Sequence, residues 1–348
     1  MPNKIIKEDL DFIINHDLNW NEFSDKNILI TGANGFLPAY MAETLLYLNE
    51  IKTLNKPCNI FALTRNIKHS QARFSNCLSN NNFKLINHDV SEIFHIKEKI
   101  DFIIHAASPA SPKYFGSDPI GVILPNVIGT INMLNIAKEK EASFLYFSSG
   151  EVYGKIPVDT ETYEDTYGYL DPLDLRSCYG ESKRMGENLC VCYGFQHNVS
   201  TKIVRIYHTY GPGMKLDDGR VFADFTKNII ENKNIELKSD GAVMRSFCYV
   251  ADAVAGFFTV MLKGKNNEAY NISNPSQTVS IKKLANILIN LFPEKKLKVV
   301  FKERQENNYL ETKIKGSLPN INKIMNIGWH PIINIEDGFY RTIMSYYI

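Results

Sequence analysis

The sequence predicts an α/β fold in which helices cover both faces of a doubly wound parallel sheet. Short apolar runs alternate with helix-length segments through the first 207 residues, which is the pattern of repeated strand and helix units. The runs are continuously apolar instead of alternating with polar residues, so both faces of each strand should be buried. With 348 residues, the chain also has room for a smaller C-terminal α/β lobe.

The expected elements follow in chain order. Residues 5–18 should form an N-terminal helix, because Ile6, Leu10 and Ile13 recur at the spacing of one helical face. Six strands are expected at residues 28–30, 60–63, 83–86, 102–104, 144–147 and 202–206. Further helices are expected at residues 117–140, around Tyr179, and at residues 221–232 and 281–291.

Composition and charge exclude several classes of partner. The 39 Lys and Arg residues nearly balance the 38 Asp and Glu residues, so no overall field favours nucleic acid or a membrane surface. The N-terminus carries acidic residues, and no apolar run approaches the ~20 residues of a membrane span. Six cysteines lack a C-x-x-C pair and the histidines lack metal-ligand spacing. We therefore expect a cytoplasmic protein with reduced cysteines, without a metal, and without a nucleic-acid or membrane partner.

A glycine motif follows the first expected strand and opens a helix. Gly32 and Gly35 would let the backbone approach a pyrophosphate, which then lies at the helix N-terminus. Asn34, Phe36 and Leu37 belong to the same turn. This position predicts a dinucleotide site for NAD or NADP.

The ends of the next three strands should complete that dinucleotide site. Thr64 and Arg65 stand where an acidic residue would bind the ribose 2′-hydroxyl of NAD, and they fit a 2′-phosphate better. Arg65 could equally be solvated, or stack on adenine in an NAD enzyme, so the choice of cofactor stays open. The adenine should lie near Asp89 and Val90, and the cofactor ribose near Ala106, Ala107 and Ser108.

A second motif, Tyr179-Gly180-Glu181-Ser182-Lys183, places a phenol and an amine on one helix face. The ammonium of Lys183 should lower the pKa of the Tyr179 phenol so that it can transfer a proton near neutral pH. Ser149, at the end of the fifth strand, would contribute a hydroxyl to the same substrate oxygen. Together with a nicotinamide site, these groups predict oxidation of a carbinol or reduction of a carbonyl.

Six further segments carry a family resemblance: HAASPASP at 105–112, NVIGT at 126–130, EVYG at 151–154, RIYHTYGP at 205–212, DGRV at 218–221 and RSFCYVAD at 245–252. On these segments, from about residue 27 to 340, the chain resembles extended short-chain dehydrogenases/reductases of the nucleotide-sugar epimerase/dehydratase family. Among them it is most similar to the UDP-glucuronate decarboxylases. The resemblance implies a nucleotide-sugar substrate that is oxidised at sugar C4 to a 4-keto intermediate.

The resemblance also assigns roles. It implies that Ser149, Tyr179 and Lys183 are catalytic, that Glu151 is the carboxylate near sugar C5, and that Arg245 is directed at the substrate. It implies a cofactor contact for Asn126, and substrate contacts for Pro109, Arg220 and Val221. His208 departs from the family's asparagine; it could still donate a hydrogen bond to the substrate, or be a histidine of the core. The expected division is an N-terminal extension over 1–24, a Rossmann-type domain over 25–207 to which 246–264 returns, and a nucleotide-sugar lobe of 208–245 and 265–348.

Three departures keep other reactions open. Gly150 stands where the decarboxylases carry serine and the 4,6-dehydratases carry aspartate, His208 replaces the usual asparagine, and Thr64-Arg65 suggests NADP. An NADPH-dependent 4-keto-sugar reductase, a 4,6-dehydratase or an epimerase are the alternatives within the enzyme class. Outside it, the alternative is a catalytically silent nucleotide-sugar binder.

We also expect a homodimer. The helices at 117–140 and around Tyr179 carry apolar residues beyond those needed to pack on the sheet, namely Val127, Ile131, Leu134, Leu189 and Tyr193. A free apolar surface of that size would favour association of two copies.

Overall fold

The computed structural model describes residues 3–157, 160–302 and 318–347. Its centre is a seven-stranded sheet in the order β11-β7-β5-β4-β1-β2-β3, and every pair in it is parallel. The strands are β1 (Asn27–Thr31), β2 (Asn59–Thr64), β3 (Phe83–Asn87), β4 (Phe102–His105), β5 (Ser143–Ser149), β7 (Thr201–Ile206) and β11 (Glu268–Ile272). The predicted doubly wound α/β fold is confirmed.

Strand β11 was not expected in this sheet. The expected division placed residues 265–348 in the second lobe, whereas β11 pairs in parallel with β7 and forms the edge of the large sheet. Its sequence, EAYNI, is half polar and lacks the continuous apolar run that marks the other strands. The polar Asn271 is nevertheless buried, because its amide donates to the carbonyls of Thr162 and Asn320 and its side-chain oxygen accepts from the Tyr153 hydroxyl.

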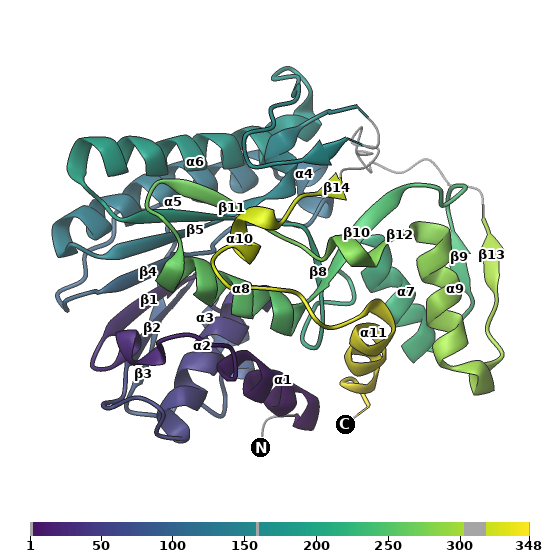
Figure 1. Cartoon of the computed structure of the whole chain (residues 1–348), viewed down its shortest axis with the longest axis horizontal. Helices are drawn as coiled ribbons and strands as arrows, with labels where there is room; N and C mark the ends of the chain where they lie inside the picture. The colour runs from purple at the N-terminus through teal and green to yellow at the C-terminus, as the bar shows by residue number, and fades with distance from the viewer. Residues whose placement is uncertain (1–2, 158–159, 303–317, 348) are drawn as a thin grey trace.

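Helices cover both faces of the sheet, as Figure 1 shows. Helices α5 (Pro119–Lys140) and α6 (Cys178–His197) lie on one face, and α2 (Phe36–Glu50) and α8 (Val250–Lys263) lie on the other. Alternate strand residues enter the two cores: Leu29 packs on the α5 and α6 side, whereas Ile28 and Ile30 pack with α2 and α8. This two-sided burial explains the continuously apolar strands.

Helix α5 is long and apolar enough to span a bilayer, the only such helix among the residues that the structure describes. Half of its most apolar stretch is buried in the fold. This burial fits a core helix that packs against the sheet and α6.

The surface of α5 and α6 differs from the one predicted for a dimer. Leu134 is fully buried in the core below α5, and Val127, Ile131, Leu189 and Tyr193 are half-buried. The helices turn out to pack on each other as well as on the sheet, which buries these side chains. The exposed large apolar residues of this face are instead Ile120, Leu124, Ile128, Met185, Val191 and Phe195.

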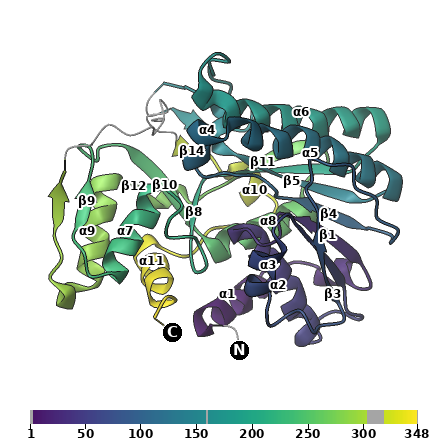
Figure 2. The ribbon, with the colours of Figure 1, turned by 180° about the vertical axis from the view of Figure 1, so that it is seen from behind.

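A smaller lobe lies beyond the carboxyl ends of the parallel strands (Figures 1 and 2). It contains a three-stranded sheet of β12 (Thr278–Ser280), β10 (Met244–Tyr249) and β8 (His208–Tyr210), and a parallel pair of β9 (Ile235–Leu237) with β13 (Val299–Phe301). Helices α7 (Val221–Ile230), α9 (Ile281–Leu291) and α11 (Ile335–Met344) pack against these strands. Short elements near the interface are α4 (Lys113–Ser117), β6 (Glu161–Thr162), β14 (Leu318–Pro319) and α10 (Asn322–Met325), and α3 (Ile67–Arg73) follows β2.

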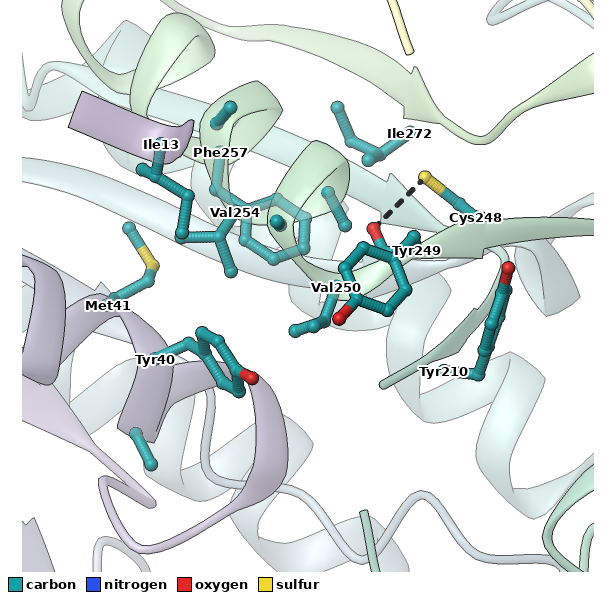
Figure 3. Packing of buried hydrophobic residues seen from close by; sticks show 14 of the residues in the cluster. Ile13, Tyr40, Met41, Tyr210, Cys248, Tyr249, Val250, Val254, Phe257 and Ile272 are labelled. Atoms are coloured by element: carbon teal, nitrogen blue, oxygen red, sulfur yellow. Dashed lines mark hydrogen bonds between the residues drawn. The ribbon is translucent and has the colours of Figure 1, made fainter. Parts of the chain in front are cut away.

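The N-terminal helix joins both parts. The helix predicted over 5–18 is α1 (Lys4–Ile14), and a single 3-10 turn follows at Trp20–Phe23. In Figure 3, Ile13 of α1 and Met41 of α2 lie against Val254 and Phe257 of α8.

A buried carboxylate on α1 connects the helix to the smaller lobe. Asp9 accepts hydrogen bonds from the hydroxyls of Tyr40 on α2 (3.1 Å) and Tyr249 on β10 (3.0 Å). It also accepts one from the guanidinium of Arg341 on α11 at 2.7 Å. One side chain thus links α1, the Rossmann core and α11.

Candidate active site

One large cavity runs from the carboxyl ends of β1, β2, β4 and β5 into the smaller lobe and has a volume of about 2430 Å³. Open α/β sheets bind ligands at this edge. Every predicted site residue except Asn126 lines it. Asn126 is buried and its amide donates to Ser182 on α6 and to the Val122 carbonyl, so its expected cofactor contact stays a prediction.

The turn after β1 forms a cradle for a dinucleotide. Gly32 has a φ of +61°, and a Cβ atom there would lie 2.7 Å from the Cα atom of Ala107. Gly35 is the N-cap of α2, so the free N–H groups of the helix face the cavity. The Thr31 hydroxyl accepts hydrogen bonds from the backbone N–H groups of Ala106 and Ala107, both at 3.2 Å. These contacts hold the β1 and β4 ends in close approach, and the resulting glycine-lined cradle fits a pyrophosphate.

At the end of β2, where the adenosine of a dinucleotide is expected, the chain carries the basic Arg65 and no acidic residue. Thr64 is buried and its hydroxyl accepts from Ser70 at 2.7 Å, so it is occupied by the fold. Arg65 is exposed and lines the cavity with Asp89 and Val90. Of Thr64 and Arg65, only Arg65 can therefore approach a ribose or its 2′-substituent. Binding of NADP stays a prediction.

The structure brings Ser149, Tyr179 and Lys183 together. Tyr179 and Lys183 lie one turn apart on α6, and Ser149 ends β5. The Lys183 amine lies 5.8 Å from the centroid of the Tyr179 ring and donates to the Phe147 carbonyl at 2.6 Å. The geometry expected of a proton-transfer trio is present, although the predicted roles remain predictions.

Burial dominates the pKa shifts of Tyr179 and Lys183. Burial raises the pKa of Tyr179 to about 12, and the hydrogen bond with Ser149 opposes that rise. Burial also lowers the pKa of Lys183 to about 7, with the charge of Glu187 acting in the opposite direction. Desolvation is therefore the largest influence on the Tyr179 pKa in this structure, and the lowering of that pKa by the Lys183 ammonium stays a prediction.

Glu151 is held by Arg176, a residue that no sequence motif indicates. Both carboxylate oxygens accept from the guanidinium of Arg176, at 2.7 and 2.8 Å. Arg176 lies in the 3-10 turn Leu175–Ser177 just before α6. Nothing in the spacing of these residues predicts the pair, since 25 residues separate them and a loop brings them together.

The smaller lobe contributes two arginines and a histidine to the cavity. Arg220 pairs with Asp218, and Arg245 donates to the Met244 carbonyl at 2.9 Å. Burial, with the positive charges of Arg245 and Arg220, holds the pKa of His208 well below its usual range. His208 is therefore a neutral imidazole, able to both donate and accept a hydrogen bond.

Packing explains why position 150 is a glycine. A Cβ atom at this position would lie 3.0 Å from the ring of Tyr207, which is closer than an ordinary contact. Tyr207 therefore occupies the space beside Ser149 and Glu151 that a larger side chain at position 150 would need.

Comparison with known proteins identifies the family of this chain. A model of the NAD dependent epimerase/dehydratase family matches residues 28–273. UDP-glucuronic acid decarboxylase 6 of Arabidopsis thaliana is 33% identical over 316 residues, which cover 90% of this chain and 87% of that protein. UDP-glucuronic acid decarboxylase 1 of Danio rerio is 32% identical over 328 residues, which cover 94% of this chain and 74% of that protein.

A solved structure supports the fold. The structure of UDP-glucuronic acid 4-epimerase from Bacillus cereus in complex with UDP-glucuronic acid and NAD matches with a TM-score of 0.76 and 22% identity, covering 92% of this chain and 98% of that one. The expected resemblance to an enzyme family that uses NAD is confirmed. With a glycine-lined dinucleotide cradle, a matching family model over most of its length and relatives about one-third identical, the chain belongs to the NAD dependent epimerase/dehydratase family.

Proposed function

We propose that this protein decarboxylates UDP-glucuronate through a 4-keto intermediate. The observation that carries the proposal is the position of Glu151, which lines the same cavity as Tyr179 and follows Ser149 by two residues. An enzyme that only oxidises or reduces C4 has no use for a carboxylate beside C5. The sequence relatives named decarboxylases support the same reaction.

The proposed reaction begins at the sugar C4 hydroxyl. Tyr179 accepts the hydroxyl proton, while Ser149 hydrogen-bonds the same oxygen. The Lys183 amine is kept in place by its hydrogen bond to the Phe147 carbonyl. The bound nicotinamide takes up the C4 hydride and later returns it. Ser149, Tyr179 and Lys183 suffice for this oxidation.

The second half of the reaction needs a group next to C5. Once C4 is a ketone, the bond between C5 and the C6 carboxylate can break, and the electron pair left on C5 is delocalised into the C4 carbonyl. Carbon dioxide leaves, C5 takes up a proton, and the ketone is reduced again, so the net reaction is redox-neutral. We assign proton transfer at C5 to Glu151, and its two hydrogen bonds from Arg176 support a fixed position for this carboxylate.

A second candidate is an NADPH-dependent 4-keto-sugar reductase. Arg65 at the end of β2, without a neighbouring carboxylate in the same turn, favours a 2′-phosphate. A reductase must exchange its cofactor in each turnover, whereas a redox-neutral enzyme can retain it. The identity and retention of the cofactor therefore distinguish the two candidates.

We further propose that the protein acts as a cytoplasmic homodimer and supplies donor sugars for polysaccharide biosynthesis. The exposed apolar residues of α5 and α6, including Ile120, Leu124 and Phe195, support association through this face. Six free cysteines fit a reducing compartment.

The test is a product assay with the purified protein. We expect UDP-glucuronate to yield carbon dioxide and a UDP-pentose without added reductant. The variant Glu151→Gln should lose product formation but still reduce bound cofactor when substrate is added. If Glu151→Gln converts substrate at the wild-type rate, Glu151 is structural and the 4-keto reductase becomes the better assignment.

A further inference from the structure

We propose that Arg176 is a positioning residue, which fixes the Glu151 carboxylate in the active site and neutralises its charge beside Tyr179. This inference rests on the proposed function, because it assigns a role in the same reaction. It explains how an enzyme can keep a carboxylate close to a phenol that must lose a proton.

The first observation is the geometry of the pair. The two terminal nitrogens of Arg176 donate to the two oxygens of Glu151 at 2.7 and 2.8 Å, a two-pronged contact that fixes the orientation of a carboxylate as well as its position. The side chains are 11% and 26% exposed, respectively, so solvent screens the pair only in part. Glu151 nevertheless lines the cavity, as does Arg176.

The second observation is a stack of three side chains that links the pair to Tyr179. The guanidinium of Arg176 lies 4.6 Å from the centroid of the Phe115 ring. The Phe115 ring stacks on Tyr179 with centroids 5.0 Å apart and an interplanar angle of 17°. Phe115 and Tyr179 are both buried. The position of Glu151 is therefore set relative to the phenol through Arg176 and Phe115.

The backbone of Arg176 is fixed as well. Its N–H donates to the Asp174 carboxylate at 3.0 Å, which caps the 3-10 turn before α6. Tyr179 is the second residue of α6, the helix that follows. The arginine and the phenol thus stand on one rigid segment, only three residues apart.

The third observation is the balance of charge around the phenol. The charged and polar groups that act on Tyr179 or contact it are Ser149 from β5, Glu151 from the turn after β5, Arg176 from the turn before α6, Lys183 from α6, Arg220 from the start of α7, and Tyr146 from β5. The charge of Glu151 raises the pKa of Tyr179, and the charges of Arg220 and Arg176 lower it. Arg176 is the only one of these cations that contacts Glu151 directly.

Loss of Arg176 therefore has two separable consequences. Glu151 loses its fixed orientation, so the step at C5 should slow. Its charge also becomes unopposed beside Tyr179, so the phenol should ionise at higher pH. Loss of an ion pair that only stabilises the fold would lower stability, but it would not shift the pH dependence of the first step or slow the step at C5 in a folded protein.

The experiment measures two steps in four forms of the protein: wild type, Arg176→Gln, Glu151→Gln and the double variant. The first step is the single-turnover reduction of bound cofactor after mixing with UDP-glucuronate or UDP-glucose. It is monitored by the absorbance of the nicotinamide at a series of pH values. The second is formation of the decarboxylated product from UDP-glucuronate. Thermal unfolding of each variant reports whether it is folded.

We expect an ordered series of pH midpoints for the first step. Glu151→Gln should lie lowest, wild type and the double variant should nearly coincide, and Arg176→Gln should lie highest, on the order of one pH unit above wild type. Product formation should fall at least roughly tenfold in Arg176→Gln, and Arg176→Gln should add no further loss to Glu151→Gln. Arg176→Lys keeps the charge but not the two-pronged contact, so it should restore the midpoint more fully than the product rate.

A matched control uses another Arg–Glu pair. Arg73 contacts Glu43 at 2.9 Å and is partly buried, but neither residue lines the cavity. Arg73→Gln should lower the unfolding temperature without moving the pH midpoint.

The outcomes separate this inference from the proposed function. If wild type reduces its cofactor and Arg176→Gln has the wild-type midpoint and product rate, the positioning role is wrong while the proposed function stands. If Arg176→Gln unfolds, Arg176→Lys decides. The positioning role is wrong if Arg176→Lys has the product rate of the wild type as well as its pH midpoint. If neither sugar reduces the cofactor in the wild type, the proposed function fails, and this inference fails with it.

Discussion

Replacing Gly32 with alanine tests the dinucleotide cradle most directly. The residue has a φ of +61°, and its missing Cβ would lie 2.7 Å from Ala107 Cα, 3.0 Å from Ala107 N and 3.2 Å from Ala106 O. All three neighbours are backbone atoms, so no flexible side chain can move aside. The alanine can be accommodated only if the β1 turn and the β4 end separate.

Two terms add up in this variant. The left-handed conformation costs an alanine about 1–2 kcal/mol, and forcing a methyl group into packed backbone costs typically about 1–3 kcal/mol. Gly32→Ala should therefore lower the free energy of unfolding by about 2–5 kcal/mol. Separation of the two strand ends also moves the wall of the cradle, so cofactor affinity should fall at least about tenfold.

Gly328 provides the matched control. It also has a positive φ, +96°, but a Cβ atom there meets only the Lys263 amine, at 3.6 Å. It does not line the cavity. Gly328→Ala should therefore show the conformational cost alone, about 1–2 kcal/mol, with no change in cofactor binding.

The assay combines urea unfolding with the amount of nicotinamide cofactor retained after purification, and with its binding constant measured by titration. Equal stability losses in Gly32→Ala and Gly328→Ala, with the wild-type cofactor affinity in both, would refute the assignment of Gly32 to a cofactor cradle.

Three further predictions concern catalysis, pH and assembly. Tyr179→Phe keeps the ring packing but removes the proton-transferring oxygen, so turnover should fall by roughly 10²–10⁴-fold while cofactor stays bound; a wild-type rate in steady-state assays would contradict the trio. Burial raises the pKa of Asp252 to about 7 from 3.8, so the folded protein retains a proton that the unfolded chain loses between these values. The contribution of Asp252 to the free energy of unfolding should therefore fall by about 4 kcal/mol as pH rises through that window. Asp9, Glu43 and Asp224 also have raised pKa values, so urea titrations of Asp252→Asn should show a smaller slope than the wild type, not a flat profile. If the proposed homodimer forms through α5 and α6, Phe195→Asp should be a monomer in sedimentation, and a wild-type protein that is already monomeric at micromolar concentration would exclude the dimer.

The sequence was most informative where a local pattern determines the structure. The six apolar strands, the turn at Gly32 and the spacing of Tyr179 and Lys183 all depend on neighbouring residues, and the structure has each of them. Strand β11 was assigned to the wrong part because an edge strand can be half polar.

Other features depend on contacts that no local pattern records. The pairing of Glu151 with Arg176 joins two turns across a loop. The raised pKa of Tyr179 depends on how completely the fold excludes water from the phenol, and burial of Leu134 depends on how α5 turns against the sheet. Charge and spacing alone cannot determine any of these three.

The contacts of α11 have a consequence for the order in which the site can form during synthesis. Phe339 of α11 stacks on Tyr210 of β8 with ring centroids 3.8 Å apart, and β8 also carries His208 on the cavity wall. Helix α11 follows every other described helix and strand in the chain, so a ribosome releases it after all of them. The dinucleotide half can fold while α11 is still being made, but β8 and the substrate side of the cavity gain this packing partner only when α11 emerges. A nascent chain should therefore bind cofactor before it can bind a sugar.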